Sequence, residues 1–373
     1  MGTDIMIEIN EMIIEYNLPE CYADDDDDND NENGGGSYDS DENKKPNIVE
    51  GYDTSQNSGT LIIDSTCAPQ NIKYPQDINL LNEACEKLEN LIKKICKEQN
   101  RYVPRMYRKY ARKDYLALAK CRKRPAKKVR AAIKKQLNYV RRDLGYVEWF
   151  LKQDNVVLFA KDAALLDVIY KVYEKQFYMY ENKTHSTESR IVSISQPYIR
   201  PIVRGKAKAP TEFGAKLDLS IDEHGMARLE KLSFDTYNES DVLIAALENY
   251  REHTSHYPER SLADKICRNR DNINFCKKWR VRLSGKALGR PKKNPDTDRK
   301  TEYQDNVDRI EVKRKFSLAK RKFGLGLMRT KLENTTKSSI LLTVIAMNVD
   351  RLNRLFIYWL IRVFFMKPMT VGC

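Results

Sequence analysis

A long helical block interrupts the strand-forming part of this chain and limits the folds open to it. From residue 76 to about residue 181, apolar residues recur at helical spacing, with breaks near Pro104, Pro125 and Asp154. Short apolar runs typical of buried strands lie on both sides of this block. We therefore expect an α/β domain whose first strand is followed by a large all-helical insertion, residues 76–185.

The strand signals are spread along the chain and alternate with helical ones. Residues 59–64 are a short β-branched run, after which 65–69 should turn. Extended segments are predicted at 190–195, 198–204, 211–222, 226–235, 260–264 and 281–285, with a hairpin turn at 223–225. Helices are predicted from an N-cap at Asn238 to about 253, and at 272–279, 308–325 and 335–365. This order predicts a sheet of mixed direction with flanking helices.

The charge distribution predicts a polyanionic partner. The chain has a net charge of +13, although residues 24–42 hold ten acids and no base, so the rest carries +23. Residues 101–142 contain 17 Lys and Arg and a single acid, Asp114, with tyrosines interleaved. A surface that contacts DNA phosphates accounts for this balance, and RNA or an acidic protein are the alternatives. The candidate DNA-binding residues here are Arg105, Arg108, Lys109, Arg112, Lys113, Arg122, Lys123, Arg124, Lys127 and Lys128.

The ends of the chain suggest further segments. Residues 1–16 predict an amphipathic helix with little to pack against, and the acidic stretch behind it should be disordered, so we treat 1–58 as one N-terminal segment. Its acids could compete with DNA for the basic surface. The other expected boundaries are 59–75 for the first strand, 186–333 for the remainder of the α/β domain and 334–373 for a packed C-terminal helix. The apolar run 355–366 is too short for a membrane span.

The cysteines favour a reducing compartment. Eight are present, with no CxxC pair and only four histidines, which argues against structural zinc or a disulfide framework. With no signal peptide recognised, we expect a cytoplasmic protein without membrane contact.

Two aspartates end predicted buried strands. Asp64 closes the first strand and Asp264 closes a later one. Two carboxylates at neighbouring strand ends repel each other unless a cation lies between them, and oxygen ligands suit Mg²⁺ or Mn²⁺. The predicted basic helix 308–325, which ends at Gly324, places Arg309, Lys313, Phe316 and Lys320 on one face. That face could form the third wall of a site that cleaves phosphodiesters.

Several stretches resemble, in order, the DDE-type transposases of bacterial insertion sequences. They are Ile62–Pro69, Pro210–Lys216, Asp235–Glu239, Tyr257–Lys265, Arg282–Gly285 with Gly289–Pro291, Arg309–Leu325 and Met347–Asn348. The resemblance implies an RNase-H-like catalytic domain, with Asp64 and Asp264 as the first two acids that bind Mg²⁺ or Mn²⁺. It also implies an N-terminally truncated copy, since such proteins usually begin with a helical end-binding domain.

The last motif of that family departs from its pattern here. The pattern is tyrosine, two residues, arginine, three residues, glutamate, six residues, lysine. Arg309 and Lys320 fit it, but Asn306 stands in place of the tyrosine and Lys313 in place of the glutamate. Glu311 is a weak substitute, because two residues along a helix correspond to about 200° of rotation.

The resemblance implies a metal-dependent DNA transposase that cleaves and joins strands at the ends of its element, impaired by Lys313. Its partners would be double-stranded DNA and a further copy of itself, at the bacterial nucleoid. The nearest alternative is a catalytically inactive DNA-binding remnant. An RNA-binding protein is a third.

Overall fold

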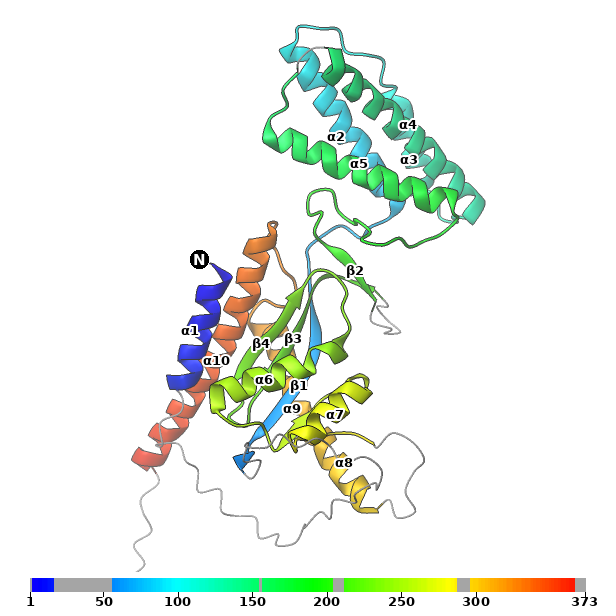
Figure 1. The fold of residues 1–373 in the computed structure, drawn as a ribbon. Coiled ribbons are helices and arrows are strands. Elements are labelled where there is room, and N and C mark those ends of the chain that lie inside the picture. Colours follow the sequence, from blue (N-terminus) through cyan, green and yellow to red (C-terminus); the bar gives the residue numbers. More distant parts are fainter. Residues whose placement is uncertain (1, 17–55, 154–155, 204–210, 287–295, 366–373) are drawn as a thin grey trace, which may run out of the picture.

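The structure is a computed structural model and describes residues 2–16, 56–153, 156–203, 211–286 and 296–365 (Figure 1). The acidic run at 24–42 and the basic loop at 289–295 lie outside the described residues.

A six-stranded mixed sheet forms the centre of the molecule. Its path is β2-β3-β1-β5-β6, and β4 also pairs with β3, along Lys216–Ile221, whereas β2 pairs with Thr211–Gly214. The strands β1, β2 and β4 pair with β3 and run antiparallel to it. On the other side of β1, the strands β5 and β6 run parallel to β1. The bounds are β1 Thr60–Pro69, β2 Arg200–Val203, β3 Thr211–Ile221, β4 Ala227–Ser233, β5 Arg260–Leu262 and β6 Arg282–Leu283. The predicted mixed α/β class is confirmed.

Helices cover both faces of this sheet. Successive side chains of β1 point to opposite faces, so Ile63 packs with α6 (Leu243–Thr254) and α7 (Arg270–Lys278). Ile62 packs on the other face with α9 (Ile310–Lys322) and α10 (Glu333–Phe365). The sheet therefore has one apolar core on each side.

Four helices between β1 and β2 build a separate core. They are α2 (Asp77–Glu98), α3 (Arg108–Ala119), α4 (Ala126–Gln153) and α5 (Ala160–Glu181). Leu88, Ile92, Val140 and Ile169 are fully buried among them. The bundle stands beyond the β2 end of the sheet, joined to it by two connecting segments (Figure 1).

The N-terminal helix α1 (Thr3–Tyr16) is packed, contrary to expectation. It lies along α10 (Figure 1), and Met6 and Ile14 are buried. Asn10 connects the two helices to β4, because Asn348 Nδ2 donates to both Asn10 Oδ1 and the Ala227 carbonyl, each at 2.8 Å. The sequence could not show this contact, since the partner of α1 lies more than 300 residues away.

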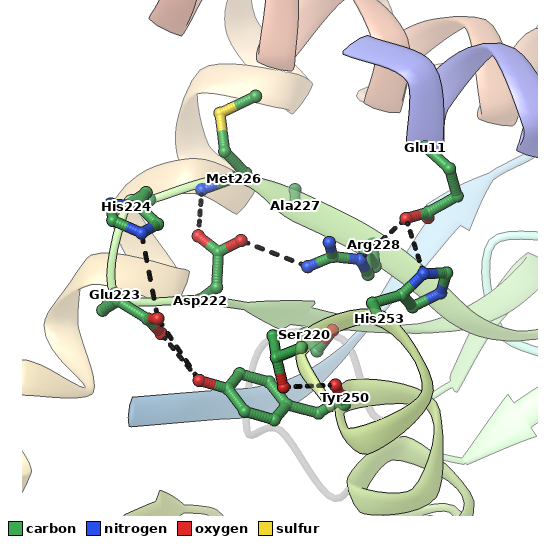
Figure 2. Close-up of polar contacts among 12 residues, drawn as sticks. Glu11, Ser220, Asp222, Glu223, His224, Met226, Ala227, Arg228, Tyr250 and His253 are labelled. Carbon is green, nitrogen blue, oxygen red and sulfur yellow. Dashed lines mark hydrogen bonds and ion pairs between the residues drawn. The ribbon is translucent and has the colours of Figure 1, made fainter. Parts of the chain in front are cut away.

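An ionic contact adds to this docking. Glu11 Oε2 of α1 lies 3.0 Å from Arg228 Nε on β4 and 3.6 Å from His253 Nδ1 on α6 (Figure 2). Arg228 also pairs with the buried carboxylate of Asp222, at 3.1 Å. The helix is therefore held to the sheet by charge as well as by apolar packing.

Two predictions about strands are wrong. The chain does not turn after Asp64, because residues 65–69 continue β1 by pairing with β3, from Ser65 opposite Asp218 to Pro69 opposite Gly214. Residues 190–195 form no strand, since Ile191 and Ile194 pack into the core of the helical bundle instead.

Two predictions about helices also need correction. The expected helix 308–325 corresponds to α9, Ile310–Lys322, and it is preceded by a helix that was not predicted, α8 (Asp296–Asp308), which ends just before Arg309. Only the first part of α10 packs, since Phe356, Tyr358 and Ile361 beyond it are exposed. No helix in the described ranges is long and apolar enough to span a bilayer.

Candidate active site

Parallel pairing of β1 with β5 brings the two aspartates to one edge of the sheet. Ile62 lies opposite Leu262, and Asp64 and Asp264 each follow two residues later. Asp64 accepts a hydrogen bond from Ser65 N at 3.0 Å. Asp264 caps the short 3₁₀ turn Lys265–Cys267 and accepts from Lys265 N at 2.6 Å.

The two carboxylates differ in environment. Burial raises the pKa of Asp64, and the nearby charge of Asp264 raises this pKa further, while Ser65 N–H, Arg309 and Lys313 oppose the rise. The Asp264 side chain is half exposed, and its Oδ1 lies 3.9 Å from Arg309 Nη1. The structure thus brings four predicted residues together, Asp64 and Asp264 from the sheet and Arg309 and Lys313 from α9.

Two arginines, each the first residue of its strand, fasten α8 to β5 and β6. Arg282 donates twice to the buried carboxylate of Asp305, each bond 2.8 Å long. Arg260 donates to Asp308 at 2.6 Å. Because Asp308 immediately precedes Arg309, these pairs set where α9 begins. Bidentate arginine–carboxylate geometry makes that position specific.

The remaining residues of the predicted motif lie elsewhere. Glu311 lines a separate hollow with Asp222 and Arg351 and forms an ion pair with Arg314 at 3.8 Å. Asn306, in the tyrosine position, is exposed on α8. Lys320 is half-buried near the end of α9, which stops before Gly324, a glycine with φ of +84° that suits the predicted helix end.

The donor set at this edge is incomplete for a divalent metal. Among the described residues no three acidic, histidine or cysteine side chains converge to hold an ion. Asp64 and Asp264 supply two carboxylates, and Arg309 and Lys313 add positive charge where a further oxygen ligand would be needed. The residues present therefore do not fit Mg²⁺ or Mn²⁺ binding of the expected kind.

A polar cluster directly behind Asp64 had not been predicted. Ser65 Oγ donates to Glu239 Oε1 at 2.6 Å, and the largely buried Lys216 Nζ lies 2.9 Å from the same oxygen. Tyr237 donates to the buried Asp218, whose pKa burial raises to about 6. These groups fix the strand on either side of Asp64. Their only sequence signal was that Lys216 and Glu239 end stretches of the transposase resemblance.

The predicted DNA-binding residues of the insertion all lie on the surface. Four basic side chains of α3, together with Lys120 just after it, line a hollow, namely Arg108, Lys109, Arg112, Lys113 and Lys120. Arg105 precedes this helix, and the other predicted residues, Arg122, Lys123, Arg124, Lys127 and Lys128, are exposed at the turn into α4. Such a surface suits a polyanion, and DNA contact there stays a prediction.

Comparison with known protein families bears on the edge that carries Asp264. The family model described as the transposase DDE domain matches residues 262–350. This segment is similar to the transposase DDE domain. The predicted resemblance to DDE-type transposases is thereby confirmed, and the match supports a DDE-type transposase. The matched segment contains Asp264, Arg309 and Lys313. It begins after Asp64 and after the helical insertion. No curated protein and no solved structure gives a significant match.

The match over residues 262–350 suggests a transposase, a class of protein that generally uses a divalent metal. DNA is accordingly the partner that the DDE domain implies.

Proposed function

We propose that this chain is an insertion-sequence transposase of the RNase-H-like type that binds DNA at the Asp64–Asp264 edge but cleaves and joins it poorly. The observation that supports the proposal is the pairing of Ile62 with Leu262, which sets both aspartates opposite Arg309 and Lys313. The family match supports the transposase class, and the geometry supports Asp64 as the partner of Asp264.

Lys313 is the reason for weak activity. Where a glutamate would supply an oxygen ligand, the lysine supplies a cation within electrostatic range of Asp64. At about 4 Å and an effective dielectric near 20, one unit charge is worth about 4 kcal/mol. Reversing such a charge can therefore cost several decades in rate.

Nicking of supercoiled plasmid DNA with Mn²⁺ tests this proposal. We expect Lys313→Glu to nick at least about a hundredfold faster than the unchanged protein, because it completes the carboxylate set. Asp64→Asn in the Lys313→Glu background is the control and should abolish the gain. Equally strong nicking by the unchanged protein and by Lys313→Glu would contradict the impairment.

A second candidate function is a catalytically inactive DNA-binding remnant. The incomplete donor set among the described residues favours it. Such a chain could inhibit an intact transposase by occupying its DNA or by joining its oligomer. Unimpaired DNA binding with no nicking, even in Lys313→Glu, would select this candidate.

A further inference from the structure

Three tyrosines are exposed where the insertion enters α3. Tyr102 is fully exposed, and the side chains of Tyr107 and Tyr110 are 42% and 60% exposed. The rings of Tyr107 and Tyr110 lie 6.2 Å apart. By contrast, the hydroxyls of Tyr115 and Tyr139 donate hydrogen bonds within the bundle, to Asn79 and Asp114 respectively. We call the exposed three the tyrosine cluster, and within it the rings of Tyr107 and Tyr110 are neighbours.

The backbone is strained at the centre of this cluster. Tyr107 has φ of +52° and ψ of +29°, a left-handed conformation that bulky residues rarely adopt. Met106 before it is buried in the bundle core, and its carbonyl accepts a hydrogen bond from Arg142. The chain is thus anchored at Met106 and reverses at Tyr107, with the ring at the surface. Strain of this kind concentrates at functional sites.

Fixed arginines surround Tyr107. The guanidinium of Arg105 lies 4.7 Å from the ring centre, and that of Arg142 lies 5.4 Å away. Arg142 pairs with the fully buried Asp143 at 2.7 Å. Arg108, next to Tyr107, pairs with buried Glu89 at 3.1 Å. The buried acids Glu89 and Asp143 therefore hold Arg108 and Arg142 in place near the ring.

Phosphate binding alone does not require this arrangement. Lysines and arginines suffice to neutralise a DNA backbone, whereas exposed rings in a basic surface suit stacking on bases. Bases in an intact duplex are already stacked on each other, so the rings can engage only a base that is unpaired. We propose that the tyrosine cluster stacks on an unpaired DNA base while the surrounding arginines and lysines hold its phosphates. This inference rests on the proposed function for DNA as the partner.

Binding of the full chain to two DNA duplexes tests this inference. One duplex is fully paired, and the other carries a single bulged 2-aminopurine. For the double variant Tyr107→Leu with Tyr110→Leu, we expect about tenfold weaker binding to the bulged duplex, loss of 2-aminopurine quenching and less than a twofold change on the paired duplex. Tyr102→Leu changes a fully exposed position where folding is not at risk. This variant should also bind the bulged duplex more weakly than the unchanged protein does.

A matched control uses Tyr303→Leu, an equally exposed tyrosine on α8. It should leave both affinities unchanged. The inference fails if the cluster variants weaken both duplexes equally, if none of them alters bulged binding, or if an RNA strand of the same sequence is preferred. It also fails if Tyr303→Leu has the same effect as the cluster variants. An unchanged protein that binds neither duplex overturns the proposed function as well, whereas paired binding without bulge selectivity overturns this inference alone.

Discussion

At position 313 this chain carries lysine where the transposase motif has glutamate. Asp64 is largely buried and its pKa is raised, so the ionised carboxylate depends on nearby positive charge. In this chain Arg309 and Lys313 provide that charge. Their charge favours the ionised form of Asp64.

A second residue whose charge has a measurable consequence is Asp143 in the insertion. It is fully buried, its Oδ2 has no hydrogen-bond partner among the described residues, and burial raises its pKa to about 6 from 3.8. The folded state therefore binds a proton on the Asp143 carboxyl group more tightly than the unfolded chain does. The stabilisation is present at low pH and is lost as the pH rises through about 6.

We expect Asp143→Asn to gain stability relative to the unchanged protein as the pH rises from 4.5 to 7.5. A shift of about two pKa units corresponds to about 3 kcal/mol at most. Urea denaturation at both pH values gives the difference in free energy of unfolding. A stability difference that does not vary with pH would contradict the buried ionisation.

At the scale of elements, helix α1 is part of the folded domain. Its apolar face lies against α10, and Glu11 reaches Arg228 on β4. Asn348 connects α10 to β4 on the same side, since its side chain accepts from Ala227 N at 2.8 Å as well as donating to the carbonyl of that residue. The first and last described helices thus close one face of the sheet together.

Asn348→Ala should destabilise this junction by about 2–4 kcal/mol, because it leaves buried backbone and Asn10 groups without partners. Asn353→Ala, at an exposed position of the same helix, serves as the matched control and should change stability by less than about 0.5 kcal/mol. Thermal or urea unfolding measures both. Equal effects of the two substitutions would show that the buried network does not hold the helices.

At the scale of the whole molecule, positive charge lies on two bodies. One is the exposed surface of the insertion around α3, and the other is α9, whose Lys313 lies near Asp64. The bundle has its own core, so its charged surface can be altered without touching the sheet. This separation makes the DNA-binding contribution of the insertion measurable by itself.

Replacing Lys109, Lys113 and Lys120 with Gln should weaken duplex binding and lower its salt dependence. Each lost phosphate contact removes about 0.9 from the slope of log affinity against log salt, so we expect a reduction of about 2 to 3. Lys171→Gln, on the exposed surface of α5, is the control. An unchanged slope in the triple variant would place the DNA contact elsewhere.

Local patterns were sufficient to predict several parts of this fold. Alternation identified the β3–β4 hairpin, helical spacing identified the insertion helices, and Gly324 marked the end of α9. The apolar runs that lead to Asp64 and Asp264 were also predicted to be strands, although β1 continues past Asp64 to Pro69. Each of these features depends on residues within one or two turns or strands of each other.

The features that were missed depend on partners far away in the chain. Ser65–Pro69 extends β1 because β3 lies beside it, and Lys216 and Glu239 meet behind Asp64 from separate segments. The break at Arg309 likewise follows ion pairs from β5 and β6 to α8. None of these contacts leaves a periodic pattern, since they join segments whose order in space is set by the sheet.

The sequence by itself therefore determined the mixed α/β class, the helical insertion, the excess of positive charge and the presence of lysine at position 313. Tertiary structure decided which charges meet. Only the parallel pairing of β1 with β5 brings Asp64 beside Asp264, and only the anchored turn at Met106 holds Tyr107 at the surface. The physical reason is that periodicity reports which face of an element is buried, whereas pairing and packing choose the neighbour it is buried against.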